Sequence, residues 1–283
     1  MTTPFFQQID ALATPNGTWI KPGGRVAAYV RSTGAQEGDD LFAMSGGLVS
    51  TIAAGLSRCR SGMNDIVYVL PGHTETFASS GVVFVPPAGA QIVGVGNPWA
   101  TNAPQITLSH AGASLTLAAA NIRVSGLRII STTAALTGAV VITGASCTLD
   151  NNFISLTGAL AANPAIAVTA APGTTIAHNR IVANCTDPIV EVTDAATLNM
   201  AIVGNLFRQT QGTSGGTAVT VADAAITGWI AHNLIGTATN GVPASLGIVI
   251  GTAALPGVHC FQNFCTDAEG GSGLITPANN DGN

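Results

Sequence analysis

Six segments of the chain repeat one pattern at intervals of 25 to 30 residues, and this repeat restricts the possible folds more than any other feature. Their sequences are VSGLRI (124–129), LDNNFI (149–154), IAHNRI (176–181), IVGNLF (202–207), IAHNLI (230–235) and CFQNFC (260–265). The first and last positions are apolar in all six. A period this regular indicates stacked structural units.

A second series of short apolar segments runs between the first. The triplets LTL, VVI, IAV, VEV, VTV and IVI end at Leu117, Ile142, Val168, Val192, Val221 and Ile250. Each unit therefore holds at least two short strands separated by corners rich in Gly, Pro, Asn and Thr, and no helical period of useful length follows residue 62. This predicts an all-β, single-stranded parallel β-helix, in which each strand pairs with its equivalent about 4.8 Å away in the next coil.

The fourth position of the hexapeptide is Asn in five of the six segments. These residues are Asn152, Asn179, Asn205, Asn233 and Asn263. Stacked coils place them directly above one another, so we expect a structural ladder of side-chain amides, at a corner where Asn also tolerates left-handed backbone geometry.

Histidine stands in the third position of two of these segments, at His178 and His232. The two are two coils apart, about 10 Å at 4.8 Å per coil, which is too far to share a metal ion. A lone exposed or hydrogen-bonded histidine is therefore favoured over a functional one.

The first 45 residues lack the repeat and are rich in turn signals, such as TPNGTWIKPGGR. We expect residues 1–45 to be an arm that becomes ordered against a partner, and residues 46–283 to form the β-helix. The residues of the arm expected to contact the partner are Phe5, Phe6, Trp19, Lys21, Arg25, Tyr29 and Arg31. Apolar spacing from Leu48 to Cys59 predicts a short amphipathic helix over about 48–61 that covers the open N-terminal end of the first coil.

Composition narrows the function classes. Only 8% of residues are charged, against about 25% in an ordinary soluble domain. With one lysine, eight arginines and a net charge of −5, the chain has no basic stripe for a nucleic acid, and no apolar run reaches the length of a membrane span. A weakly charged surface suits association, so self-association is expected. Five cysteines without a CxxC motif, and a start unlike a signal peptide, indicate reduced thiols and synthesis in a cytosol.

Two resemblances add to this. The stretch STIAAGLSRCRSGMNDIVYVLPGHTE, followed by AQIVGVGNPW and ANIRVSGLRI, resembles the opening of pectate-lyase-like right-handed β-helix proteins, over roughly residues 48–265. The stretch TPNGTWIKPGGRVAAYVRSTGAQ, joined to RCRSGMNDIVYVLPGHTE, is similar to bacteriophage virion proteins that decorate the capsid as trimeric cement proteins. The second resemblance implies a homotrimer on the capsid surface that is made in the host cytoplasm and binds the major capsid protein.

Candidate chemistry is sparse. Four acidic residues, Asp187, Glu191, Asp194 and Asp223, lie close enough for a Ca²⁺ site to be considered, but strand alternation favours a solvated edge. Arg128 and Arg180 share a column with Phe153 between them and no carboxylates beside them, and His73 near Glu75 is interpreted as part of a turn. We therefore predict no catalytic residue, cofactor or metal.

The function predicted from the sequence is a structural one: a capsid decoration protein that trimerises and stabilises a bacteriophage head. The alternative is a phage tailspike-type or other glycan-binding or glycan-depolymerising β-helix protein, which would need acidic residues and aromatic platforms for sugars. A surface adhesin is a third class, and it would usually carry a secretion signal and an anchor.

Overall fold

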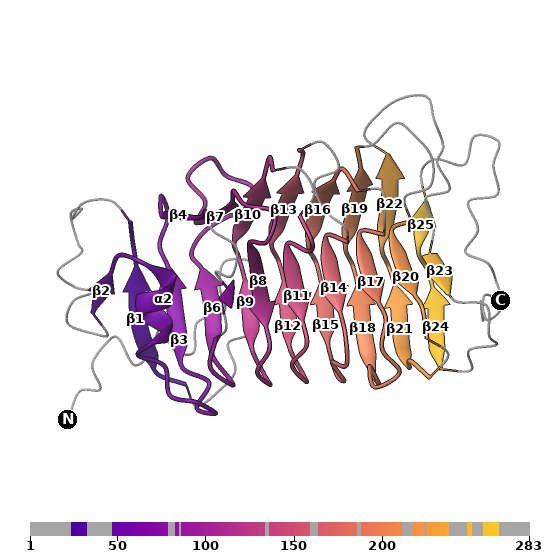
Figure 1. Ribbon diagram of the computed structural model, residues 1–283, viewed down its shortest axis with the longest axis horizontal. Helices are drawn as coiled ribbons and strands as arrows, with labels where there is room; N and C mark the ends of the chain where they lie inside the picture. Colours follow the sequence, from indigo (N-terminus) through magenta and orange to yellow (C-terminus); the bar gives the residue numbers. More distant parts are fainter. Residues whose placement is uncertain are drawn as a thin grey trace.

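The computed structural model describes residues 24–32, 47–78, 83–84, 86–133, 136–158, 164–185, 188–210, 217–223, 225–237, 248–250 and 257–265. In these residues the chain winds into a right-handed parallel β-helix, whose coils follow one another along the long axis (Figure 1). Every strand pairing among them is parallel. Each pairing joins equivalent strands of neighbouring coils, except for the pairings of two additional strands at the N-terminal end. The predicted fold class is confirmed.

Three sheets run along the β-helix. Sheet A contains β1 (Val26–Val30), β2 (Leu48–Val49), β3 (Ile66–Val69), β6 (Gln91–Gly94), β9 (Arg123–Ser125), β12 (Thr148–Asp150), β15 (Thr175–Ala177), β18 (Met200–Val203), β21 (Gly228–Ala231) and β24 (Val258–Phe261). Sheet B contains β4 (Thr74–Phe77), β7 (Gln105–Leu108), β10 (Arg128–Ser131), β13 (Phe153–Leu156), β16 (Arg180–Ala183), β19 (Leu206–Gln209), β22 (Leu234–Thr237) and β25 (Phe264–Cys265). Sheet C contains β5 (Val83–Phe84), β8 (Ser114–Leu117), β11 (Val140–Ile142), β14 (Ile166–Val168), β17 (Val190–Val192), β20 (Val219–Val221) and β23 (Ile248–Ile250).

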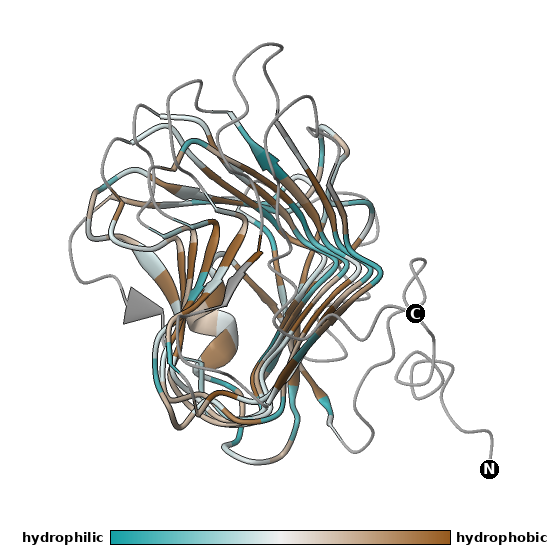
Figure 2. Ribbon diagram, turned by 90° about the vertical axis from the view of Figure 1, so that its right-hand side faces the viewer, coloured by the Kyte–Doolittle hydropathy of each residue, from teal (hydrophilic) through white to brown (hydrophobic). Residues whose placement is uncertain are grey.

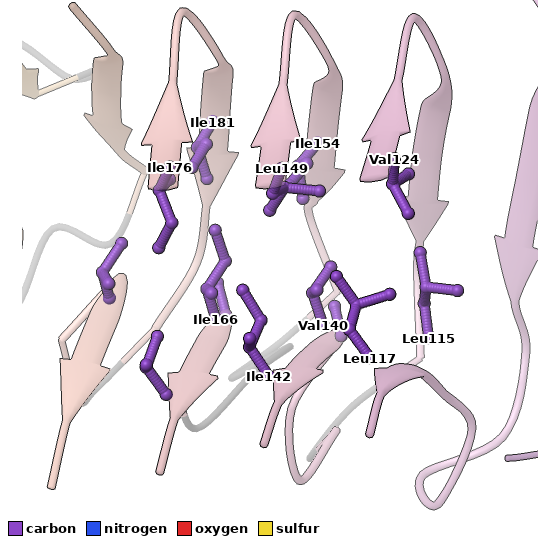
Figure 3. Close-up of a cluster of buried hydrophobic side chains, with 14 of the residues drawn as sticks. Leu115, Leu117, Val124, Val140, Ile142, Leu149, Ile154, Ile166, Ile176 and Ile181 are labelled. Carbon is purple, nitrogen blue, oxygen red and sulfur yellow. The ribbon is translucent and has the colours of Figure 1, made fainter. Parts of the chain in front are cut away.

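The inward side chains of the three sheets form one continuous core. Ile176 of sheet A, Ile181 of sheet B and Ile166 of sheet C point into the same interior from one pair of adjoining coils (Figure 3). Each is fully buried, and burying a side chain of this size contributes about 1.5 to 3 kcal/mol. Because strands alternate between inward and outward residues, a register slip by one residue would expose a whole column. The apolar columns of the repeat thus determine the stacking.

From β9 onward, the corner between sheets A and B is only two residues long. Its first residue has a positive φ in six successive coils: Gly126 (74°), Asn151 (54°), His178 (55°), Gly204 (65°), His232 (55°) and Gln262 (51°). The left-handed position is therefore the third residue of the repeat, not the ladder Asn that follows it. His178 and His232 adopt a conformation that costs a non-glycine residue roughly 1 kcal/mol.

A single helix, α2 (Ile52–Leu56), lies within the outline of the coils when they are seen along the axis (Figure 2). It is shorter than the predicted 48–61, because Leu48 and Val49 pair with β1 as a strand and Thr51 begins the helix by accepting a hydrogen bond from the Ala54 backbone N at 3.1 Å. Ile52 and Leu56 are buried. No described helix is long and apolar enough to cross a membrane.

Part of the predicted arm belongs to the β-helix. Residues 26–30 form β1, which extends sheet A beyond β3, and Tyr29 stacks on Tyr68 with ring centroids 5.6 Å apart. Ala27 and Val30 join the core, and Tyr29 is also buried, so this segment has enough apolar surface to complete a sheet edge. Residues 1–23 and 33–45 of the predicted arm lie outside the described residues.

Candidate functional site

The five predicted ladder asparagines form one continuous chain of side-chain hydrogen bonds. The Nδ2 atom of Asn152 donates to Oδ1 of Asn179 at 3.1 Å, and the same bond joins Asn179 to Asn205 at 3.1 Å, Asn205 to Asn233 at 3.0 Å and Asn233 to Asn263 at 2.8 Å. The ladder starts from a coil without Asn: the backbone N of Leu127 donates to Oδ1 of Asn152 at 3.0 Å.

Each ladder side chain also serves the backbone of a neighbouring coil. For Asn205, Nδ2 donates to the Ile176 carbonyl at 2.9 Å, while Oδ1 accepts from the backbone N of Asn179 at 2.9 Å. Four of the five are at most 1% exposed, and Asn263 in the last described coil is half-buried. These amides satisfy backbone groups that the two-residue corner leaves without a strand partner, so they hold the coils together.

The two predicted surface histidines lie on the outside of the same corner. His178 and His232 are both exposed, and His232 meets the Phe261 ring edge-on at 5.7 Å. A Cβ at Gly204, in the coil between them, would come within 2.6 Å of His178 Nδ1. In the part of the chain that the structure describes, no group of three or more His, Cys, Asp or Glu residues could hold a metal ion.

The candidate Ca²⁺ residues are divided between a strand and two turns. Glu191 faces outward from β17, whereas Asp194 and Asp223 lie in the turns that follow β17 and β20. Each Asp accepts a hydrogen bond from the backbone N two residues on, Asp194 from Ala196 at 2.8 Å and Asp223 from Ala225 at 2.9 Å. Asp187 lies outside the described residues.

His73 and Glu75 are in contact, which the sequence interpretation missed. His73 Nε2 lies 3.2 Å from Glu75 Oε2, and the same oxygen accepts a hydrogen bond from the Ile52 backbone N at 2.8 Å. Residues two apart in an extended segment share a face, and this spacing was the signal that could have predicted the pair. His73 has no exposed surface, so the pair connects the start of α2 to the first coil.

Two carboxylates are buried beside arginines. Asp150 accepts from Arg123 Nε at 3.0 Å and from Arg123 Nη2 at 2.8 Å, and desolvation nevertheless raises the pKa of Asp150. Asp65 accepts from Arg60 Nε at 2.9 Å and from Arg60 Nη2 at 2.7 Å, and these bonds hold the pKa of Asp65 well below its usual range. Both arrangements connect neighbouring turns or coils, a placement that charge spacing along the sequence does not indicate.

Four of the cysteines in the described chain form no disulfide. Cys147, Cys185 and Cys260 are buried, and Cys59 is half-buried. Burial raises the pKa of Cys59 and that of Cys260 to about 11, so both thiols stay protonated at neutral pH.

The outward side of sheet B, here called the sheet B outer face, carries arginine, aromatic, aliphatic and hydroxyl side chains. One column consists of Thr74, Gln105, Arg128, Phe153, Arg180, Leu206, Leu234 and Phe264, and the second of Thr76, Thr107, Ile130, Ser155, Val182, Arg208 and Gly236. Arg128 and Arg180 lie over opposite sides of Phe153 along the column, with their Cζ atoms 5.5 and 5.6 Å from its ring centroid. Arginine, aromatic and aliphatic side chains together are typical of protein interfaces.

Large apolar side chains are exposed on the last described coils. Leu234 and Phe264 are neighbours on sheet B with 40% and 64% of their surface exposed, and Trp229 and Phe261 lie on adjoining strands of sheet A with 48% and 40% exposed. Scattered exposed apolar residues are normal, but neighbouring ones of this size mark a surface for association.

Comparison with known proteins does not assign this chain to a family. No protein-family model matches the chain, and neither a curated protein nor a solved structure shows significant similarity to it.

Proposed function

We propose that this chain is a structural virion protein, a decoration protein that binds the outside of a bacteriophage capsid as a homotrimer and stabilises the shell through contacts with the major capsid protein. The resemblance of residues 14–36 and 58–75 to phage cement proteins supports the class of function. The stacked coils support the proposed stabilising role, because three parallel sheets join neighbouring coils along the β-helix.

The observation that carries the proposal is the chemistry of the outward side chains. On sheet C the described outward residues are Ser114, Thr116, Val141, Ala167, Glu191 and Thr220, and on sheet B aliphatic and aromatic residues alternate with hydroxyls and three arginines. A free monomer stays soluble through many interspersed charges, whereas a surface of this kind is suited to burial against other protein chains. A rigid protein whose sides are built for contact fits a shell component.

Shell binding tests the proposal directly. The purified full-length chain would be mixed with shells assembled from the major capsid protein of the same genome, and the mixture sedimented. We expect the chain to pellet with the shells and to saturate at a fixed ratio to the capsid protein. A chain that stays in the supernatant at every ratio would contradict the proposal.

A matched variant tests the predicted contact residues. Replacing Phe5, Phe6 and Trp19 together by Ala in the full chain should abolish pelleting, because large aromatic side chains dominate interface energies. Deleting 1–45 is the wrong control, since it would remove β1 and uncover the edge of β3.

The glycan-binding alternative has one observation in its favour. Trp229 and Phe261 are exposed on adjoining strands of sheet A, and aromatic rings of this kind can stack on sugar rings. If shells are not bound, polysaccharide binding by the wild type and by a Trp229→Ala variant is the next measurement.

A further inference from the structure

Charge is segregated on the described surface of the β-helix. Three arginines, Arg128, Arg180 and Arg208, face outward from sheet B, and no described outward residue of sheet B is acidic. Glu191, Asp194 and Asp223 lie on sheet C or directly after it, where no described strand or turn carries a basic residue. One side of the molecule is thus basic and another acidic.

Two of the three arginines on the basic side each have a hydrogen-bond donor without an acceptor. The Nε atoms of Arg128 and Arg180 are buried without a hydrogen-bond partner, although both guanidinium groups pack on the ring of Phe153. Leaving a buried donor unsatisfied costs about 1 to 3 kcal/mol. Both residues as a whole are half-buried, so a second molecule can contact the outer part of each guanidinium group but not the buried Nε atom.

The opposite charges lie at matching heights along the axis. Arg180 on β16 and Glu191 on β17 belong to one coil, and Asp194 follows in the turn after β17. Arg208 on β19 and Asp223, in the turn after β20, belong to the next coil. A rotation about an axis parallel to the β-helix keeps every coil at its own height, so a copy related by such a rotation presents its acidic residues level with the arginines of its neighbour.

The remaining outward residues allow the two sides to approach closely. Val182 and Leu206 lie beside the arginines on sheet B, while Val141, Ala167 and Thr220 lie on the outside of sheet C. Small and aliphatic side chains on both sides can pack closely, with charges to set the register.

We propose that the sheet B outer face of one copy of this chain packs against the outer side of sheet C of a second copy, with Arg180 opposite Glu191 and Asp194 and with Arg208 opposite Asp223. The contact is heterologous, since two different sides meet, and such contacts form a ring when the rotation closes. That three copies form the ring is inferred from the proposed function. That these two sides meet is inferred from the charges and from their positions along the axis.

Charge reversal and rescue test this interface. Arg208→Glu in the full-length chain places like charges opposite each other and should weaken self-association at least about 100-fold. Adding Asp223→Arg to the same chain restores the pair with reversed signs and should restore assembly. An independent second pair, Arg180→Glu rescued by Glu191→Arg, keeps the test decisive if one substitution disturbs folding.

The readout is the sedimentation coefficient at one chain concentration and about 0.1 M salt, with circular dichroism to verify the fold. The control is Asn102→Glu, an exposed site on the loop between β6 and β7, which should assemble like the wild type. Self-association that survives both single reversals, or failure of both rescues in folded protein, would overturn the proposed interface. A wild-type assembly that does not bind shells would contradict the proposed function and leave the interface intact. A monomer that binds shells would overturn the interface and the homotrimer, and it would leave the proposed shell binding intact.

Discussion

The Asn205→Leu substitution should lower the free energy of unfolding by about 3 to 5 kcal/mol, because it leaves several buried groups without partners at once. Leu removes the acceptor for the backbone N and the side-chain amide of Asn179, bonds of 2.9 and 3.1 Å. It also removes the donor to the Ile176 carbonyl and to Asn233 Oδ1, at 2.9 and 3.0 Å. Leu keeps the branched shape of Asn but carries two larger methyl groups, so overpacking at this buried site adds to the loss of hydrogen bonds.

The measurement is urea unfolding at one fixed chain concentration. Asn102→Leu is the matched control, since it makes the same chemical change at an exposed position and should alter stability by less than about 0.5 kcal/mol. Equal urea midpoints for Asn205→Leu and Asn102→Leu would mean that the ladder does not hold the coils together.

The Arg123→Met substitution should be comparably damaging, with an expected loss of about 3 to 5 kcal/mol at neutral pH, because it strands a buried charge. Asp150 is 8% exposed and depends on Arg123 for its two short hydrogen bonds, while Ser125 Oγ is 3.4 Å away. Met keeps much of the volume and removes the charge, so the loss is measured by the same urea titration.

A double variant separates charge from packing. Arg123→Met combined with Asp150→Leu removes both charges, and a buried ion pair replaced by apolar residues is often close to neutral in stability. We therefore expect the double variant to be more stable than Arg123→Met alone. A double variant at least as unstable as the single one would show that packing, and not the stranded carboxylate, causes the loss.

Because the coils stack, much of the fold could be predicted from the sequence. A column of the β-helix requires the same kind of residue once in each coil, so the spacing from Asn152 to Asn263 indicated both the coil length and the ladder partners. The same logic placed Arg128, Phe153 and Arg180 in one column, where the structure shows the two arginines packed on the ring.

Other features could not be predicted from the repeat, because they depend on contacts outside its pattern. The left-handed corner position was not predicted, because Gly, Asn, His and Gln all occupy it. The backbone there requires a positive φ, which does not demand one particular side chain. Helix α2 began later than predicted, since Leu48 and Val49 had a strand partner in β1, which lies 19 residues earlier in the chain at Tyr29 and Val30. The ion pair of Arg123 and Asp150 links two coils diagonally, and only three-dimensional neighbours reveal it.

The mass of the purified full-length chain in dilute solution tests the central claim, that these weakly charged sides are made for self-assembly. Sedimentation velocity or mass photometry of the wild type in about 0.1 M salt should give one species of three chains, about 85 kDa for a chain of 28.2 kDa. The same measurement in about 1 M salt should show partial dissociation, since screening weakens the charge pairs. A stable 28.2 kDa monomer at tens of micromolar would contradict the account, because the outward faces of sheets B and C would then tolerate water without a partner.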